Sequence, residues 1–248
     1  MRSVFAIGTY TASAWSLLGD REEQQDAFCL VRRRGALFAA VCDGIGGLPG
    51  GALASRSTVE ALQDAWLENL NAAPAHFYRQ AVDWMDRAVV EKSLGGGSTV
   101  VSVWLQDGRL FWLSIGDSGL YLLRGGQLRR LAEAHTYASY LQSALAQGSI
   151  TQEAYAREMK NGRALTSYLG MNGVRQYAQN PQSAVLERGD MVLLCSDGLT
   201  QAVPEERLAA LLNTKRSVRS LSELLRRAVL AHTGGRQDNA TLVLIRYR

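Results

Sequence analysis

The chain has 248 residues, of which 47% are hydrophobic and 20% are charged. These values are typical of an ordinary globular protein, which can bury a large core without disulfides or structural metals. The formal net charge of +4 is modest and dispersed, which argues against a nucleic-acid-binding surface. We expect the basic run at residues 32–34 to be a solvated hairpin turn.

The cysteines and the N-terminal segment indicate the compartment. Cys29, Cys42 and Cys195 lie in or beside apolar runs without paired spacing, so we expect buried thiols in a reducing cytosol. Residues 1–19 lack the apolar core of a signal peptide, and no window approaches the roughly 18 apolar residues of a membrane-spanning helix. We therefore expect a soluble, cytoplasmic, monomeric protein with one domain over residues 1–248.

Hydrophobic periodicity and turn signals predict a mixture of strands and helices. In chain order we expect a strand at 36–42, helices at 52–69 and 77–90, strands at 98–104, 110–115, 119–123 and 127–131, two short helices within 137–163, a strand at 191–195, a helix at 221–232 and a strand at 240–245.

The turns between these strands indicate the fold class. Asp107-Gly108 and Gly125-Gly126 are hairpin signals, and hairpins produce antiparallel sheets. The long helices must cover the faces of those sheets. The sequence therefore favours a layered α/β sandwich of the α+β type over a doubly wound parallel sheet.

Acidic residues recur at the ends of the predicted strands. Asp43 and Asp197 each end an apolar strand and precede glycine, Asp117 follows another strand, and Asp238 precedes the last one. A plain strand-to-helix turn is an alternative explanation for the Asp43 motif alone. Four such acids suggest one carboxylate cluster, which repels itself unless cations neutralise it. Hard divalent cations prefer such oxygen ligands, and a pair about 3.5–4 Å apart suits phosphoryl hydrolysis.

The segment before the first predicted strand adds two candidates. Arg21 is suited to bidentate contact with phosphate, although a solvated surface arginine is the alternative. Asp26 is a further acid. His76, His135 and His232 are poor metal-ligand candidates, because the carboxylates already account for a hard-metal site.

Together these segments resemble the protein phosphatase 2C (PPM) family in its compact bacterial form, over residues 19–247. The matching motifs are residues 21–26, Asp43-Gly44-Ile45-Gly46-Gly47, Gly97-Ser98-Thr99, Gly116-Asp117-Ser118, residues 165–170, residues 189–199 and Asp238-Asn239. Each motif is weak alone, whereas their order and spacing are specific. The family's fold is a pair of antiparallel sheets packed together and flanked by helices, which agrees with the sandwich expected above.

The resemblance implies a role for each candidate. Asp43 would bridge two Mn²⁺ or Mg²⁺ ions, with the Gly44 carbonyl on one, and Asp197 and Asp238 would bind the other. Asp117 would belong to a weaker third metal site. Asp26 would act through a bound water or through neighbouring ligands, and Arg21 would hold the substrate phosphate. Asp43, Asp26 and Arg21 are thus the catalytic candidates, and residues 137–163 would form the family's variable flap.

Four positions depart from the family's pattern. These are Gln24 in place of asparagine, Ala134 where aspartate is common, Gly119 where arginine is usual, and Ile45 where some eukaryotic members carry a histidine proposed as general acid. The departure at Ile45 leaves the proton donor to the leaving group unassigned.

The resemblance implies a serine/threonine protein phosphatase that uses a metal-activated water and opposes a bacterial serine/threonine kinase. Its partners would be phosphorylated proteins, without nucleic acid and without membrane insertion. Two alternatives remain open: a catalytically weak binding or regulatory module with the same fold, and a phosphatase of an anti-sigma antagonist.

Overall fold

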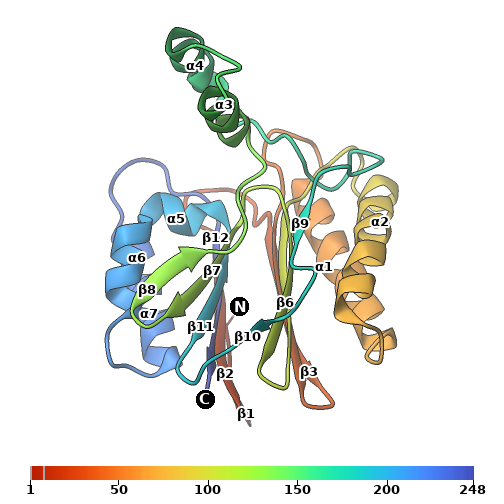
Figure 1. The fold of residues 1–248 in the computed structure, drawn as a ribbon, viewed down its shortest axis with the longest axis vertical. Coiled ribbons are helices and arrows are strands. Elements are labelled where there is room, and N and C mark those ends of the chain that lie inside the picture. Colours follow the sequence, from red (N-terminus) through yellow and green to blue (C-terminus); the bar gives the residue numbers. More distant parts are fainter. Residues whose placement is uncertain (1, 8) are drawn as a thin grey trace.

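The computed structural model describes residues 2–7 and 9–248, and it shows two antiparallel sheets packed face to face (Figure 1). The first sheet has the order β1–β2–β12–β11–β7–β8, and its strands are β1 (Arg2–Ile7), β2 (Tyr10–Leu17), β12 (Ala240–Tyr247), β11 (Met191–Cys195), β7 (Gly119–Arg124) and β8 (Gln127–Arg130). The second sheet has the order β10–β6–β5–β4–β3, with β9 also paired to β6. Its strands are β10 (Ala184–Val185), β6 (Arg109–Ile115), β5 (Val100–Gln106), β4 (Ala36–Asp43), β3 (Asp26–Arg33) and β9 (Ala178–Gln179).

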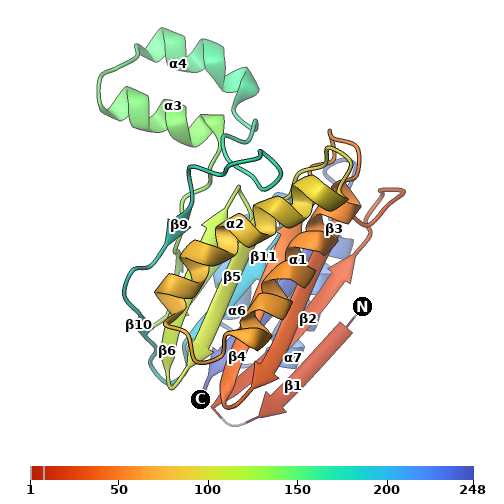
Figure 2. The ribbon, with the colours of Figure 1, turned by 90° about the vertical axis from the view of Figure 1, so that its right-hand side faces the viewer.

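Helices cover the outer face of each sheet. On the second sheet lie α1 (Gly51–Glu68) and α2 (Pro74–Lys92), as Figure 2 shows. On the first sheet lie α5 (Asp197–Ala202), α6 (Glu205–Leu212) and α7 (Val218–Leu230). The helices α3 (Tyr137–Ala146) and α4 (Gln152–Glu158), followed by a 3₁₀ turn at Met159–Asn161, project beyond the ends of the strands. The sandwich expected from the sequence is therefore confirmed.

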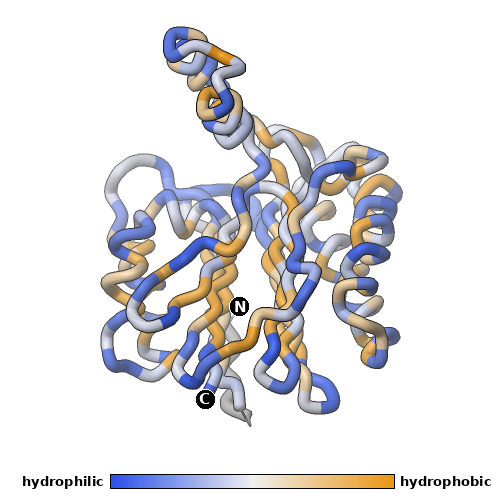
Figure 3. Tube along the Cα trace, in the orientation of Figure 1, coloured by the Kyte–Doolittle hydropathy of each residue, from blue (hydrophilic) through white to orange (hydrophobic). Residues whose placement is uncertain are grey.

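The alternation of side chains along the strands builds three apolar cores. In β4, Leu37, Ala39 and Val41 face the other sheet, whereas Phe38 and Ala40 face the helices. A strand that is buried on both faces reads as a continuous apolar run, which is why residues 36–42 were recognisable. Figure 3 shows these apolar stretches within the strands and the hydrophilic residues at the turns.

The hairpin turn and the buried thiols expected from the sequence are present. Arg34 and Gly35 turn between β3 and β4 with positive φ angles, so the basic run ends in a hairpin. Thr151 caps α4 by accepting a hydrogen bond from the Ala154 N–H. The three cysteines are buried, and burial raises the pKa of Cys29 and of Cys195 to about 12 and that of Cys42 well above its usual value.

Other elements were not predicted or begin earlier than predicted. Four of the eight residues of β2 are alanine or serine, which weaken its strand pattern, and its pairing with β12 along its whole length supplies the stability instead. Helix α7 begins three residues before the predicted start, because Ser217 caps it by accepting from the Ser220 N–H. Within the described part of the chain, no helix has the length and apolar content needed to span a membrane.

Trp66 occupies the centre of the core beneath α1. Its ring stacks on Phe38 with centroids 4.9 Å apart and meets Trp104 edge-on at 5.8 Å. Substituting Trp66→Ala should lower the free energy of unfolding by about 3–5 kcal/mol, because the cavity cannot refill. Urea unfolding measures this loss. The control Leu67→Ala, on the exposed side of the same helix, should change the value by less than about 0.5 kcal/mol. Equal losses in the two variants would contradict this packing.

Candidate active site

Five aspartates meet at one rim of the sandwich. Asp43 ends β4, Asp197 opens α5 directly after β11, and Asp238 lies two residues before β12. Asp26 opens β3 directly opposite Asp43 in the antiparallel ladder, and Asp117 follows β6. All except Asp26 line a cavity of about 350 Å³. The structure thus brings together the four acids that the sequence analysis expected to cluster, Asp43, Asp117, Asp197 and Asp238, and adds Asp26.

Asp43 and Asp197 are neighbours in this group of acids. Each carboxyl group lies close enough to the other to affect its pKa. Burial, followed by the charge of Asp26, raises the pKa of Asp43 well above its usual value. Burial, followed by the charge of Asp238, raises the pKa of Asp197. The backbone around Asp43 is fixed on both sides, because its N–H donates to Thr99 Oγ1 at 3.1 Å and its carbonyl accepts from the Thr99 N–H at 2.8 Å.

Asp26 is nearly inaccessible, with 6% of its surface exposed. Its Oδ2 accepts a 2.7 Å hydrogen bond from Ser196 Oγ, whereas Oδ1 has no hydrogen-bond partner among the described residues. Burial raises the pKa of Asp26 to about 7. An unpaired buried carboxylate oxygen needs a water or a cation nearby, which fits the predicted role of Asp26 beside a metal site.

Gly44 lies where only glycine fits, and Asp117 is a further buried acid of the rim. A Cβ at residue 44 would lie 2.2 Å from the Gly51 carbonyl oxygen, so only glycine fits against the start of α1. This close approach places the Gly44 backbone in the lining of the cavity. Burial, followed by the charge of Asp197, raises the pKa of Asp117 to about 6.

Arg21 and Asp238 form an ion pair. Arg21 Nη2 lies 2.6 Å from Asp238 Oδ2, and Asp238 Oδ1 accepts from the Asn239 N–H at 2.8 Å. Both oxygens of Asp238 are therefore engaged, and no group of three or more His, Cys, Asp or Glu side chains among residues 9–248 is arranged to hold one metal ion. The set Asp43, Asp197 and Asp238 remains a prediction, since Asp238 Oδ2 would have to leave Arg21 to join it.

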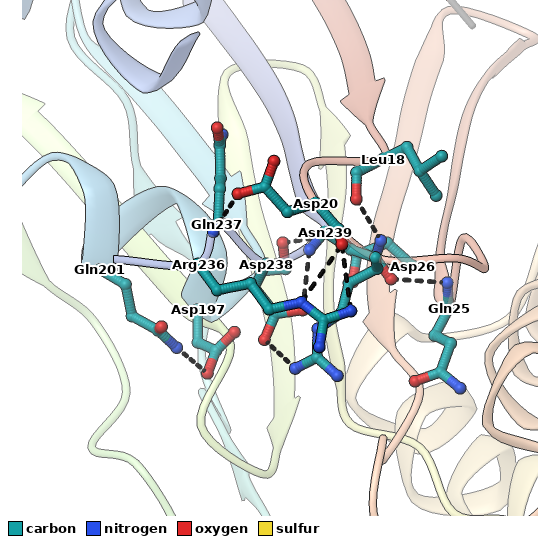
Figure 4. Close-up of polar contacts among 12 residues, drawn as sticks. Leu18, Asp20, Gln25, Asp26, Asp197, Gln201, Arg236, Gln237, Asp238 and Asn239 are labelled. Carbon is teal, nitrogen blue, oxygen red and sulfur yellow. Dashed lines mark hydrogen bonds and ion pairs between the residues drawn. The ribbon is translucent and has the colours of Figure 1, made fainter. Parts of the chain in front are cut away.

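The structure adds residues that the sequence analysis did not select. Arg163, at the end of the 137–163 insert, lines the cavity as a second cation, and its charge lowers the pKa of Asp197. Asn239 ties the rim together, because its Oδ1 accepts from the Gln25 N–H at 2.8 Å and its Nδ2 donates to the Leu18 carbonyl at 2.7 Å (Figure 4). In the sequence, the only sign that Arg163 could belong to the site was its own positive charge.

The histidines stand apart from the cavity. His76 is exposed at the start of α2, and none of the three histidines lines the cavity. His135 is 7% exposed, and its Nδ1 accepts a hydrogen bond from the Gly116 N–H at 3.0 Å. Burial lowers the pKa of His135, so the imidazole is neutral.

The donor set of the rim fits hard divalent cations. It offers carboxylate and carbonyl oxygens, with no sulfur or imidazole in the cavity lining. The carboxylates are crowded enough to raise one another's pKa values, and a bound cation would relieve that repulsion.

The raised pKa values give the metal-free protein a defined pH response. Asp26 titrates near pH 7 when folded and near about 3.9 when unfolded. Between these values the folded chain holds a proton that the unfolded chain has released, so the contribution of Asp26 to stability falls as the pH rises through this window. Asp26→Asn should therefore gain up to a few kcal/mol relative to the wild type between pH 4.5 and pH 7.5.

Urea unfolding of both proteins in EDTA measures this difference. Asp64→Asn, which changes an exposed carboxylate of α1, serves as the control and should show no such trend. A difference between Asp26→Asn and the wild type that stays constant with pH would contradict the assignment.

Comparisons with known proteins agree with this geometry. Residues 18–233 match the family model described as "Protein phosphatase 2C". The chain is 32% identical over 216 residues to the serine/threonine phosphatase stp of Listeria welshimeri, covering 83% of this chain and 82% of that protein.

Solved structures match over nearly the whole chain. A serine/threonine phosphatase of S. agalactiae superposes with a TM-score of 0.80 at 21% identity, covering 96% of this chain and 100% of that one. The catalytic domain of the phosphatase PstP in complex with two manganese ions has a TM-score of 0.73 at 25% identity, covering 96% and 97%. The rim of aspartates, the two-sheet fold and the match over residues 18–233 establish that this chain belongs to the protein phosphatase 2C family.

Proposed function

We propose that this protein is a metal-dependent phosphatase that hydrolyses phosphoserine and phosphothreonine in proteins. The observation that carries the proposal is the convergence of four aspartates and two arginines, Arg21 and Arg163, on one cavity in a chain of this family. Carboxylates attract cations, and guanidinium groups bind phosphate oxygens bidentately. A phosphate monoester with two divalent cations matches this arrangement of charges.

We assign the metal ligands by the family's pattern. Asp43 would serve both of two Mn²⁺ or Mg²⁺ ions, the Gly44 carbonyl would contribute to one of them, and Asp197 and Asp238 would contribute to the other. Asp26 would support the site through its unpaired Oδ1, and Asp117 would contribute to a weaker third site. The two manganese ions in the PstP complex support a site for two cations.

When bound, the cations would supply a water of lowered pKa and positive charge facing the phosphate. Arg21 would have a second function in this scheme. It forms an ion pair with Asp238 in the structure, and it would be available to hold phosphate if Asp238 served as a metal ligand. Arg163 reaches the same cavity from the insert and adds positive charge beside Asp197. No covalent enzyme intermediate is required.

The wider setting follows the same proposal. Residues 1–248 form one phosphatase domain in which residues 137–163 are the flap, and the protein acts as a monomer in the cytoplasm. Its partners are phosphorylated proteins and a serine/threonine kinase whose action it reverses.

Hydrolysis of p-nitrophenyl phosphate and of a phosphothreonine peptide tests the proposal. Turnover should require Mn²⁺ or Mg²⁺ and cease in EDTA. Asp43→Asn should lower kcat by about a thousandfold or more, since it removes the residue shared by both cations. The exposed substitution Asp64→Asn serves as the control. Failure of folded wild-type protein to turn over either substrate with any divalent cation would overturn the proposal and favour a binding module.

Arg21 should act mainly on substrate binding. Arg21→Ala removes charge-assisted hydrogen bonds worth about 1.5–3 kcal/mol, so KM for p-nitrophenyl phosphate should rise by about 10- to 100-fold. Steady-state kinetics at saturating Mn²⁺ measures the change. Arg56→Ala, on the exposed face of α1, is the matched control. An unchanged KM would exclude Arg21 from phosphate binding.

A further inference from the structure

The 137–163 insert leaves and rejoins the body of the protein beside one histidine. The two connecting strands run together, because the Tyr137 N–H donates to the Ala164 carbonyl at 2.8 Å and the Thr166 N–H donates to the His135 carbonyl at 2.9 Å. His135 therefore contacts the returning strand and immediately precedes Thr136, the N-cap of α3. Figures 1 and 2 show the insert projecting from this junction.

His135 also holds the loop that carries Asp117 through two hydrogen bonds. Its N–H donates to the Gly116 carbonyl at 2.9 Å, and its Nδ1 accepts from the Gly116 N–H at 3.0 Å. Both backbone polar groups of Gly116 are thus paired with one residue. Because Nδ1 accepts, the neutral imidazole carries its proton on Nε2. His135 cannot turn without releasing Gly116.

Glycine is required at residue 116. Its φ angle is +92°, and a Cβ there would lie 2.6 Å from Thr99 Cγ2. Because Gly116 directly precedes Asp117, the contacts of His135 act one residue away from that carboxylate.

A second residue holds the same loop but does not touch the insert. Arg130, from β8, donates to the Asp117 carbonyl at 2.8 Å and to the Ala132 carbonyl at 3.0 Å. Its guanidinium also lies over the ring of Tyr121 and pairs with Glu205. Ser118, which directly follows Asp117, also holds the loop through a 2.7 Å hydrogen bond between its Oγ and Thr99 Oγ1. Of these contacts, those of His135 link the loop to the insert.

We propose that His135 is a positioning residue that couples the orientation of the 137–163 insert to the position of Asp117 in the cavity. A protein that presses on the insert would thereby shift a carboxylate of the catalytic rim. The catalytic meaning of this coupling rests on the proposed phosphatase function, whereas the mechanical link does not.

Hydrogen–deuterium exchange of the metal-free protein tests the link without relying on activity. His135→Ala should raise exchange both in residues 115–118 and in residues 137–163. His135→Asn should restore protection, because its Oδ1 can accept from the Gly116 N–H in place of Nδ1. Arg130→Ala should raise exchange around Asp117 and Ala132 while leaving the insert protected.

Two results would overturn the link. The first is a rise in exchange in only one of the two segments of His135→Ala. The second is a rise in exchange of the insert in Arg130→Ala as large as that in His135→Ala, which would show that His135 is not the specific connection.

A double-mutant cycle tests the effect on catalysis. In the wild-type background, His135→Ala should lower kcat/KM for p-nitrophenyl phosphate by about tenfold, within the usual range for residues acting through a contact. In the Asp117→Asn background, His135→Ala should lower kcat/KM by less than about twofold, because the carboxylate through which His135 acts is already absent. Costs that simply add would overturn a role through Asp117. Absence of phosphatase activity in the wild type would instead refute the proposed function and leave the exchange test valid.

Discussion

Repulsion between acidic side chains that share one partly buried rim governs how this end of the protein is built. Burial and neighbouring charge together raise the pKa values of Asp43, Asp197, Asp26 and Asp117. An ion pair between Arg21 and Asp238 offsets part of this repulsion at the edge of the rim. A bound divalent cation would offset more of it, because opposite charge stabilises the ionised carboxylates.

The two-sheet sandwich makes such a rim tolerable. Strands buried on both faces supply three apolar cores, and their packing offsets the cost of bringing like charges together. The carboxylates lie where strands end, so their side chains reach the cavity while the strand backbones keep their ladder hydrogen bonds. A fixed scaffold with charged loop ends is a common arrangement for binding and catalysis.

Features that depend on a local sequence pattern could be predicted. Features that depend on contacts between residues far apart in the chain could not. Apolar runs that end in Asp-Gly located Asp43 and Asp197, because the strand and its end are both encoded locally. Strand β2 was not predicted, because pairing with β12 rather than its own small residues stabilises it. The Arg21–Asp238 pair joins residues 217 positions apart, and Arg163 enters the cavity only through the path of the insert. Neither could be read from spacing.

The burial of the Cys42 and Cys195 thiols has a consequence for redox chemistry. Oxidants attack the thiolate, and the raised pKa values of Cys42 and Cys195 keep both sulfurs protonated at neutral pH. Cys42 adjoins Asp43 and Cys195 lies two residues before Asp197, so sulfenic acid at either would disturb the carboxylates beside it. Burial withholds these sulfurs from peroxide, and among the described residues no cysteine or methionine lines the cavity. We therefore expect the site to resist inactivation by oxidation of sulfur.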